Sequence, residues 1–179
     1  MNIYPASAGF FYAIHWAVQM NLVINKLITE LKKVIDGDPW YGSSLKSIFE
    51  GVGSFRAVKR ISANSHSIAE IALHMLAWNE EVASRLVGNK PQAPQRGDWQ
   101  IIEKLDKDEW NNIVQKIFKE HARIEKLVAS LSIEKLEEQV GKDRNPALGT
   151  GISYREMLVG LMEHNVYHGG QIALLKKLI

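Results

Sequence analysis

The sequence predicts an all-α protein, a four-helix bundle, from three observations. Apolar residues recur every three or four positions in four separate segments, which is the period of an amphipathic helix. The strict alternation of apolar and polar residues that marks a strand is nearly absent. Long links separate the four segments, so we expect crossovers along the bundle or caps over its ends rather than tight hairpins.

The first two helices have recognisable ends. The first is expected from about Met20 to the sequence DGDP at residues 36–39, where Gly and Pro stop a helix. The second is expected to begin at Ser67, because Ser67 and Glu70 have the spacing of a capping box. It should end at the Gly-Asn pair, residues 88–89.

The third and fourth helices follow the same pattern. The third is predicted from about Asp106 to Leu131, with His121 in the middle of its apolar stripe. The fourth should open at a second capping box, Ser153 and Glu156, and continue to the C-terminus. The links therefore cover about residues 36–66, 89–105 and 132–152.

Composition limits the classes of function. The chain has 179 residues, and we expect a single domain over residues 1–179. It has no cysteine, which excludes disulfides, thiolate metal sites and cysteine nucleophiles and fits a reducing compartment. A net charge of +2 gives no reason to expect a nucleic acid partner. No apolar run approaches the roughly 18 residues of a membrane span, and the apolar N-terminus lacks the basic region of an export signal. We therefore expect a cytoplasmic protein that does not bind membranes.

His164 and His168 are the strongest candidates for functional residues. They are four positions apart, so both lie on one face of the fourth helix, between Leu161 and Leu175 on its apolar stripe. Two imidazoles in an apolar seam are costly to desolvate unless each finds a partner. A divalent cation meets this need, because neutral imidazole is a good metal ligand. The alternative is that both side chains form hydrogen bonds in the core or face a wet cleft.

A third ligand has to come from another helix. His74 flanks the apolar side of the second helix and is one candidate, although a histidine at such a position is more often simply packed. His121 is the other candidate, as a ligand, a hydrogen-bond partner of a ligand or a core residue. The remaining histidines, His15 and His66, lie near the starts of elements and are interpreted as surface or capping residues.

Other residues near the histidines have two interpretations each. Gln171, one turn beyond His168, is either a contact for bound water or substrate or an ordinary surface amide. Glu70, one turn before His74, is either a carboxylate that orients the imidazole or only the capping-box residue. Gly169 and Gly170 cost helix stability, on the order of 1 kcal/mol each, which suggests a close helix approach or room beside a metal.

The segments HNVYHGGQIALLKK, residues 164–177, and HSIAEIALHMLAWNEE, residues 66–81, resemble the C-terminal signature and the second helix of the DinB-like (DinB/YfiT) metalloenzymes. Residues 40–53 and the Asp98-Trp99 pair are similar to elements of one branch of that family. The resemblance covers about Met20 to the C-terminus, and residues 1–19 have no counterpart, so they are a possible N-terminal extension.

The resemblance implies an up-down-down-up bundle whose metal ligands are His74, His164 and His168. It favours His74 over His121, which becomes, with Gln171 and Glu70, a candidate for the surroundings of the metal or the substrate pocket. Tyr41 stands where that branch often has histidine, so this loop is not assigned a ligand. The resemblance also implies a homodimer, to which the apolar first helix could offer a surface.

The expected function is that of a metal-dependent enzyme of hydrolase or thiol-transferase type. Three histidines leave coordination positions open, as in catalytic sites. The cofactor would be one divalent metal ion, for which we favour zinc or nickel, and a low-molecular-weight thiol is a second candidate that the resemblance supplies. A small-molecule substrate would enter where residues 36–66 and 89–105 cap the bundle. The sequence offers no general base, which leaves a non-enzymatic metal-binding or stress-response dimerisation protein as the alternative.

Overall fold

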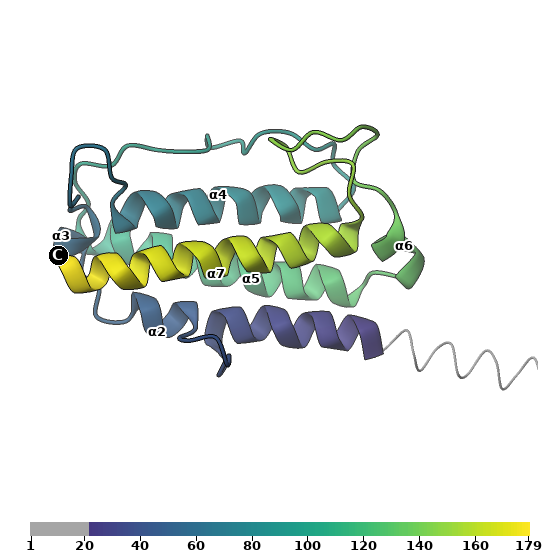
Figure 1. Cartoon of the computed structure of the whole chain (residues 1–179), viewed down its shortest axis with the longest axis horizontal. Helices are drawn as coiled ribbons and strands as arrows, with labels where there is room; N and C mark the ends of the chain where they lie inside the picture. Colours follow the sequence, from purple (N-terminus) through teal and green to yellow (C-terminus); the bar gives the residue numbers. More distant parts are fainter. Residues whose placement is uncertain (1–21) are drawn as a thin grey trace, which may run out of the picture.

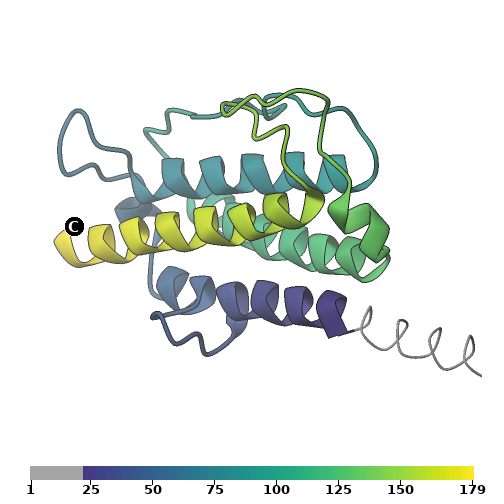
Figure 2. The same ribbon diagram turned by 45° about the vertical axis from the view of Figure 1, so that its right-hand side comes forward.

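Four long helices lie side by side along one axis in the computed structural model of the chain, which describes residues 22–179 (Figures 1 and 2). The first occupies residues 22–36, and the others are α4 (Ile68–Leu86), α5 (Lys107–Ala129) and α7 (Tyr154–Leu178). No β-strand is found in residues 22–179. The predicted all-α bundle is therefore confirmed, whereas the proposed extension at residues 1–19, with His15, and the predicted start at Met20 lie outside the described residues.

The path of the chain explains the long links. Figure 1 shows that residues 22–36 and α7 run in one direction, while α4 and α5 run in the other. The arrangement is the expected up-down-down-up bundle. Since α4 and α5 are parallel, the link at residues 87–106 has to return along the length of the bundle, and both views show it beside α4.

Capping boxes fix where the long helices begin. Ser67 and Glu70 cap α4, and Ser153 and Glu156 cap α7, each pair with both reciprocal hydrogen bonds, as predicted. A third capping box, Asp106 with Glu109, starts α5 and was not predicted from the sequence. The predicted helix boundaries that fall within residues 22–179 agree with the structure to within about two residues, the usual uncertainty of helix ends.

Three short helices interrupt the links. They are α2 (Leu45–Phe49) and α3 (Ser54–Ala57) between the first helix and α4, and α6 (Ile133–Glu137) between α5 and α7. They have four or five residues each, too few for a helical period to stand out in a sequence. The link at residues 36–66 is thus partly helical, which the sequence did not indicate, and its two short helices pack on the bundle.

The core consists of two apolar clusters with a polar layer between them. One cluster contains Ile68, Trp110 and Ile172, and the other contains Val82, Ile124 and Leu158. Asn79, His121 and Asn165, all buried, occupy the helix positions that separate the two. The Nδ2 group of Asn165 lies 3.1 Å from His121 Nε2 and donates to Asn79 Oδ1 at the same distance. His121 is therefore a core residue that ties α5 to α7.

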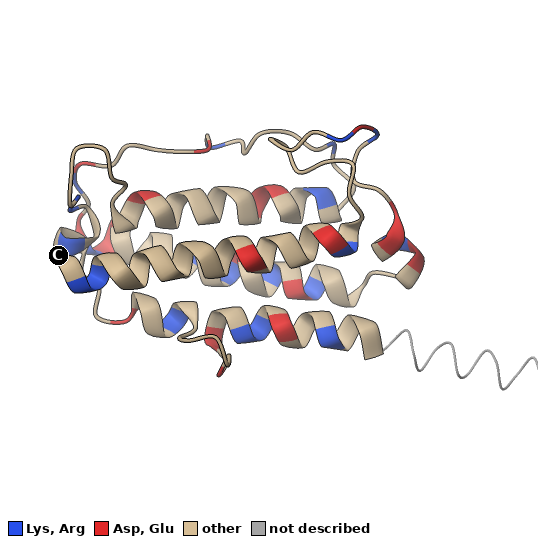
Figure 3. Ribbon diagram, viewed as in Figure 1, with Lys and Arg blue, Asp and Glu red and all other residues tan. Residues whose placement is uncertain are grey.

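Charges on the described helices are mixed. Figure 3 shows lysine and arginine interspersed with aspartate and glutamate along the bundle, without a stripe of one sign. None of the described helices is long and apolar enough to span a membrane.

Candidate metal centre

Three histidine side chains meet between α4 and α7. His74 comes from α4, and His164 and His168 come from successive turns of α7. Each offers one ring nitrogen, and these three atoms all lie within 4.8 Å of one another. The Nε2 atoms of His74 and His164 are 2.9 Å apart. Within residues 22–179 this is the one group of three histidines or carboxylates arranged so that it could hold a metal ion.

Asp98 orients the ring of His74. Its carboxylate Oδ1 lies 2.9 Å and its backbone oxygen 3.1 Å from His74 Nδ1. Both oxygens can only accept, so His74 Nδ1 carries the proton and Nε2 keeps its lone pair. The indole N–H of Trp78 donates to the same Oδ1 at 2.7 Å, which holds the carboxylate in place. A carboxylate behind a ligating histidine is the usual second partner of a metal site.

Gln171 has the same effect on His168. Its Oε1 lies 2.7 Å from His168 Nδ1, so the Nδ1–H donates to the amide oxygen and the lone pair of His168 is left on Nε2. His164 Nδ1 is buried and has no hydrogen-bond partner within the described part of the chain. His164 is therefore held by its neighbours in the cluster rather than by a partner behind it.

The three rings are arranged so that they could hold a divalent cation. With lone pairs on the Nε2 atoms of His74 and His168, the cluster presents acceptors to a common point. Burial, followed by the proximity of His168 and His74, lowers the pKa of His164 to about 3. Burial also lowers the pKa of His168. Both rings are therefore neutral near pH 7, the protonation state in which imidazole binds metals.

Trp99 covers the cluster from the side of the link at residues 87–106. Its ring is stacked on that of His74, with centroids 4.0 Å apart and planes 6° apart. The ring of His66 stacks on Trp99 in turn, at 3.7 Å. His66 is half exposed, as expected of a surface residue, but its place in this stack was not foreseen.

A cavity of about 500 Å³ opens beside the cluster. Its walls are α4, α7 and the segment at residues 146–149, and all three histidines and Asp98 line it. The link at residues 89–105 contributes as expected, through Asp98. Residues 146–149 of the third link form the part of the cavity wall that was expected from residues 36–66, none of which lines this cavity.

The other predicted residues are accounted for nearby. Glu70 is the capping-box residue of α4 and also accepts from the side chain of Arg60 and the backbone N–H of Ile102, and it forms no hydrogen bond with His74. Gly169 allows α2 to approach, because a Cβ there would lie 2.9 Å from Leu45 Cδ2 and 3.3 Å from Ile48 Cδ1. A Cβ at Gly170 would contact nothing within 4 Å. Of the two glycines, only Gly169 is therefore explained by helix packing, namely by the close approach of α2.

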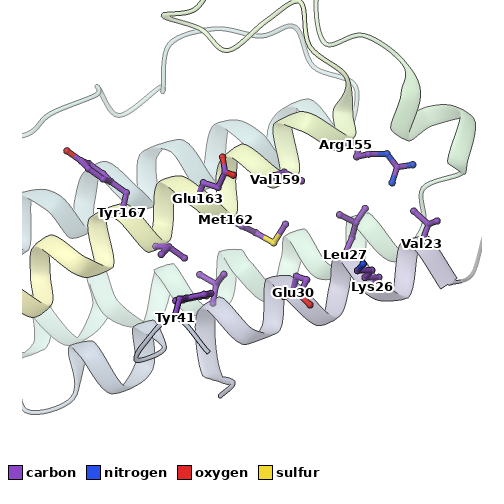
Figure 4. A pocket seen from close by; sticks show the side chains of 12 residues that line it. Val23, Lys26, Leu27, Glu30, Tyr41, Arg155, Val159, Met162, Glu163 and Tyr167 are labelled. Carbon is purple, nitrogen blue, oxygen red and sulfur yellow. The ribbon is translucent and has the colours of Figure 1, made fainter. Parts of the chain in front are cut away.

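Tyr41 lies apart from the histidines. It lines a second cavity, of about 840 Å³, between the first helix and α7 (Figure 4). The lining is mainly apolar, with Lys26, Glu30, Arg155 and Glu163 among the side chains labelled there. Tyr167 lines both cavities, so they flank the same stretch of α7.

Sequence reasoning assigned no role in the site to Trp78 and Arg85, and it gave Asp98 and Trp99 only as a pair that resembles a family element. Trp78, four residues after His74, lies on the same helix face and could have been connected with it by that spacing. Arg85 lines the cavity and forms an ion pair with Glu81, although both side chains are buried. Two charged residues one turn apart on an otherwise buried helix are a signal that the sequence does contain.

A family model described as the DinB superfamily matches residues 47–172, a range that contains the three histidines, Asp98 and Trp99. No curated protein and no solved structure matches the chain significantly.

Proposed function

Since the chain belongs to the DinB superfamily, we propose that it is a metal-dependent enzyme of hydrolase or thiol-transferase type that acts on a small molecule. The ligands in this proposal are His74, His164 and His168. The observation that supports it best is the convergence of these three imidazoles, two of them with their Nδ1 protons already engaged, at the wall of a cavity.

The donor set favours catalysis over a purely structural role. Three protein ligands leave a coordination position for water or substrate, whereas structural sites are closed by four. A bound ion would supply Lewis acidity toward a carbonyl group or would stabilise a thiolate. We propose zinc or nickel as the ion, since imidazole nitrogen suits both, and a low-molecular-weight thiol as a candidate co-substrate.

The residues around the cluster have separate tasks in this proposal. Asp98 and Gln171 hold the ring orientations of His74 and His168, and Trp99 excludes water from one side of His74. Asp98 is the one carboxylate among the lining residues of this cavity. Because it already accepts from His74 and Trp78, it is a poor general base, which favours thiol transfer over hydrolysis.

The second candidate function is a non-enzymatic metal-binding or stress-response dimerisation protein. The lack of an unengaged carboxylate in the lining of this cavity favours it. A homodimer and a cytoplasmic location belong to both proposals and stay predictions.

Metal analysis of the purified protein tests the ligand set. We expect one equivalent of metal in the wild type and in His121→Ala, and much less than one equivalent in His74→Ala and in His168→Ala. His121→Ala is the matched control, because that ring is equally buried but contacts Asn165 and does not belong to the group of three histidines. Stoichiometric metal in His74→Ala, or its loss in His121→Ala, would show that the ligand set is wrong.

Turnover separates the two functions. The metal-loaded protein should convert members of a panel of thiol adducts and esters, and His168→Ala should not. A wild type that binds one equivalent of metal and converts no member of the panel would favour the non-enzymatic protein.

A further inference from the structure

Arg85 lies at the opposite end of the cavity from the histidines. It is on the last turn of α4, is only 2% exposed, and lines the same cavity as His74, His164 and His168. A nearly fully buried arginine is unusual, because removing a guanidinium from water is costly unless its donors are paired.

Only part of the guanidinium is paired with protein. Nε donates to Glu81 Oε1 at 2.9 Å, and Nη2 donates to the backbone oxygen of Gln92 at 3.3 Å. Glu81 Oε1 also accepts from the backbone N–H of Gln92, so this edge of the fork is fixed. Within residues 22–179, Nη1 has no hydrogen-bond acceptor, although a guanidinium carries five N–H donors. A purely structural ion pair would not need to leave that edge open.

The cavity wall that faces Arg85 Nη1 carries no side chain, because Gly149 stands there. Gly149 also lines the cavity, and its backbone has a φ of +61°, a conformation that favours glycine. A Cβ at Gly149 would lie 3.8 Å from Arg85 Nη1, so any side chain there would occupy the approach to the guanidinium. The glycine keeps the approach free.

Between the two polar ends the cavity is apolar. Val82, Leu148, Ile152 and Leu161 are among its lining residues. His74 and Arg85 are eleven residues apart on α4, which corresponds to roughly 16 Å along the helix axis. Helical side chains lean toward the N-terminus, so the guanidinium and the histidines should be on the order of 10 Å apart.

We infer that the substrate is an elongated, mainly apolar small molecule with a carboxylate at one end, which Arg85 binds through Nη1 while the reacting group lies at the histidines. This inference rests on the proposed function for the role of the histidines, but the anchor at Arg85 is a property of the cavity alone. Arginine suits a carboxylate, because its guanidinium is always charged and its N–H groups form charge-assisted hydrogen bonds.

Binding of octanoate and of 1-octanol to the metal-free protein tests the anchor without the metal. The two probes share a chain of about the right length and differ in charge. Calorimetry should show octanoate binding on the order of tenfold tighter than octanol, the ratio expected from one charge-assisted hydrogen bond. Equal affinities would overturn the inference.

Two variants make the test specific. In Glu81→Met/Arg85→Met both members of the buried pair are replaced, because removing Arg85 alone would leave the carboxylate of Glu81 unpaired. This variant should lose the preference for octanoate. Glu80→Met/Arg96→Met removes an ion pair between α4 and the same link outside the cavity lining and should keep the preference. A preference that survives the loss of Arg85 would overturn the inference.

Gly160→Leu provides a variant that does not touch the ion pair. Gly160 lines the cavity on the second turn of α7, and a Cβ there would meet nothing within 4 Å, so leucine fills the cavity and favours the helix. Both probes should bind much more weakly, while the zinc content after loading stays at the wild-type value. Unchanged affinity for octanoate would show that the acid binds elsewhere and would overturn the inference.

Zinc loading and 2-mercaptoethanol binding are measured on the same proteins. This thiol is too short to reach Arg85, so it reports on the histidines alone. If the wild type takes up no zinc but prefers octanoate through Arg85, the proposed function fails and the anchor stands. If zinc and the short thiol bind but no Arg85-dependent preference is found, the anchor fails and the proposed function stands.

Discussion

The indole of Trp99 lies flat against the imidazole of His74, with the two planes only 6° apart. Trp99 belongs to the return link between α4 and α5, and its neighbour Asp98 contacts the Nδ1 atom of the same imidazole. Two consecutive residues of an irregular segment thus fix both the face and the edge of one histidine. The link at residues 87–106 is therefore part of the candidate metal centre as well as a connection.

Replacing Trp99 should weaken metal binding without abolishing it. Trp99→Ala removes the stacked ring, which exposes His74 to water and lets its side chain turn, and we expect affinity for zinc to fall on the order of tenfold. Trp99→Phe should lose less, because a ring remains. Chelator competition measures the affinities, and Trp40→Ala is the control, since that side chain is 96% exposed. Equal effects of the two alanine changes would contradict a role for the stack.

Replacing Asp98 should have a larger effect. Asp98→Ala removes the carboxylate contact to His74 Nδ1, keeps only the weaker contact to the backbone oxygen, and leaves the indole N–H of Trp78 without its acceptor. The loss of such a partner typically lowers metal affinity about 10- to 100-fold. Glu103→Gln, a carboxylate lost from the same link at an exposed position, should leave the affinity unchanged. The same chelator competition applies, and wild-type affinity in Asp98→Ala would refute the assignment.

His121 should make the metal-free protein sensitive to acid. Burial lowers its pKa to about 4, below the usual value of about 6.5 in an unfolded chain. As pH falls from 6.5 to 4 the unfolded chain takes up a proton that the folded one does not, so the free energy of unfolding decreases. Between pH 7.5 and pH 5 this one group should account for a loss of about 2 kcal/mol.

His121→Gln keeps an acceptor for Asn165 and removes the titrating ring. Urea unfolding of the metal-free proteins at both pH values should show a smaller acid-induced loss in the variant, by about the same 2 kcal/mol. The other histidines are common to both proteins and cancel in the comparison. An equal loss in the two proteins would mean that His121 does not titrate as proposed.

The adjacent glycines Gly169 and Gly170 of α7 should respond in opposite ways to the same substitution. Gly169→Val inserts atoms against Leu45 and Ile48 of α2, and overpacking of this kind costs about 1–3 kcal/mol. Gly170→Val meets open space and should be neutral or slightly stabilising, because valine is a better helix former than glycine. Urea unfolding measures both. If Gly170→Val destabilised the protein and Gly169→Val did not, the contact of α2 with Gly169 would be refuted.

The sequence predicted those features of the structure that depend on residues close together in the chain. Ser67 with Glu70 and Ser153 with Glu156 mark helix starts through hydrogen bonds that span three residues, so the boundaries of α4 and α7 could be predicted. The helical period placed His164 and His168 on one face for the same reason. His74, in contrast, was chosen over His121 as the third ligand only because of the family resemblance. Its position beside α7 depends on how two helices pack, which no local pattern specifies.

The remaining parts of the site depend on segments without periodicity. Asp98 reaches His74 because a link twenty residues long folds back along α4, and no local pattern specifies that path. Residues 146–149 reach the cavity through turns that include glycines with positive φ. The hydrogen bond of Gln171 to His168 was not among the two interpretations of that residue, which were a contact for bound water or substrate and an exposed amide, because a spacing of three residues suits all of these.

The position of the histidines on α4 and α7 has one more consequence. His74 and His164 are 90 residues apart in the chain, so an ion held by both would act as a crosslink that closes a long loop. Ligand binding to the native state alone raises the free energy of unfolding by about 2.7 kcal/mol at a free concentration one hundred times Kd. The supply of metal in the surroundings would then govern how long the protein resists unfolding and proteolysis, as well as whether it can react.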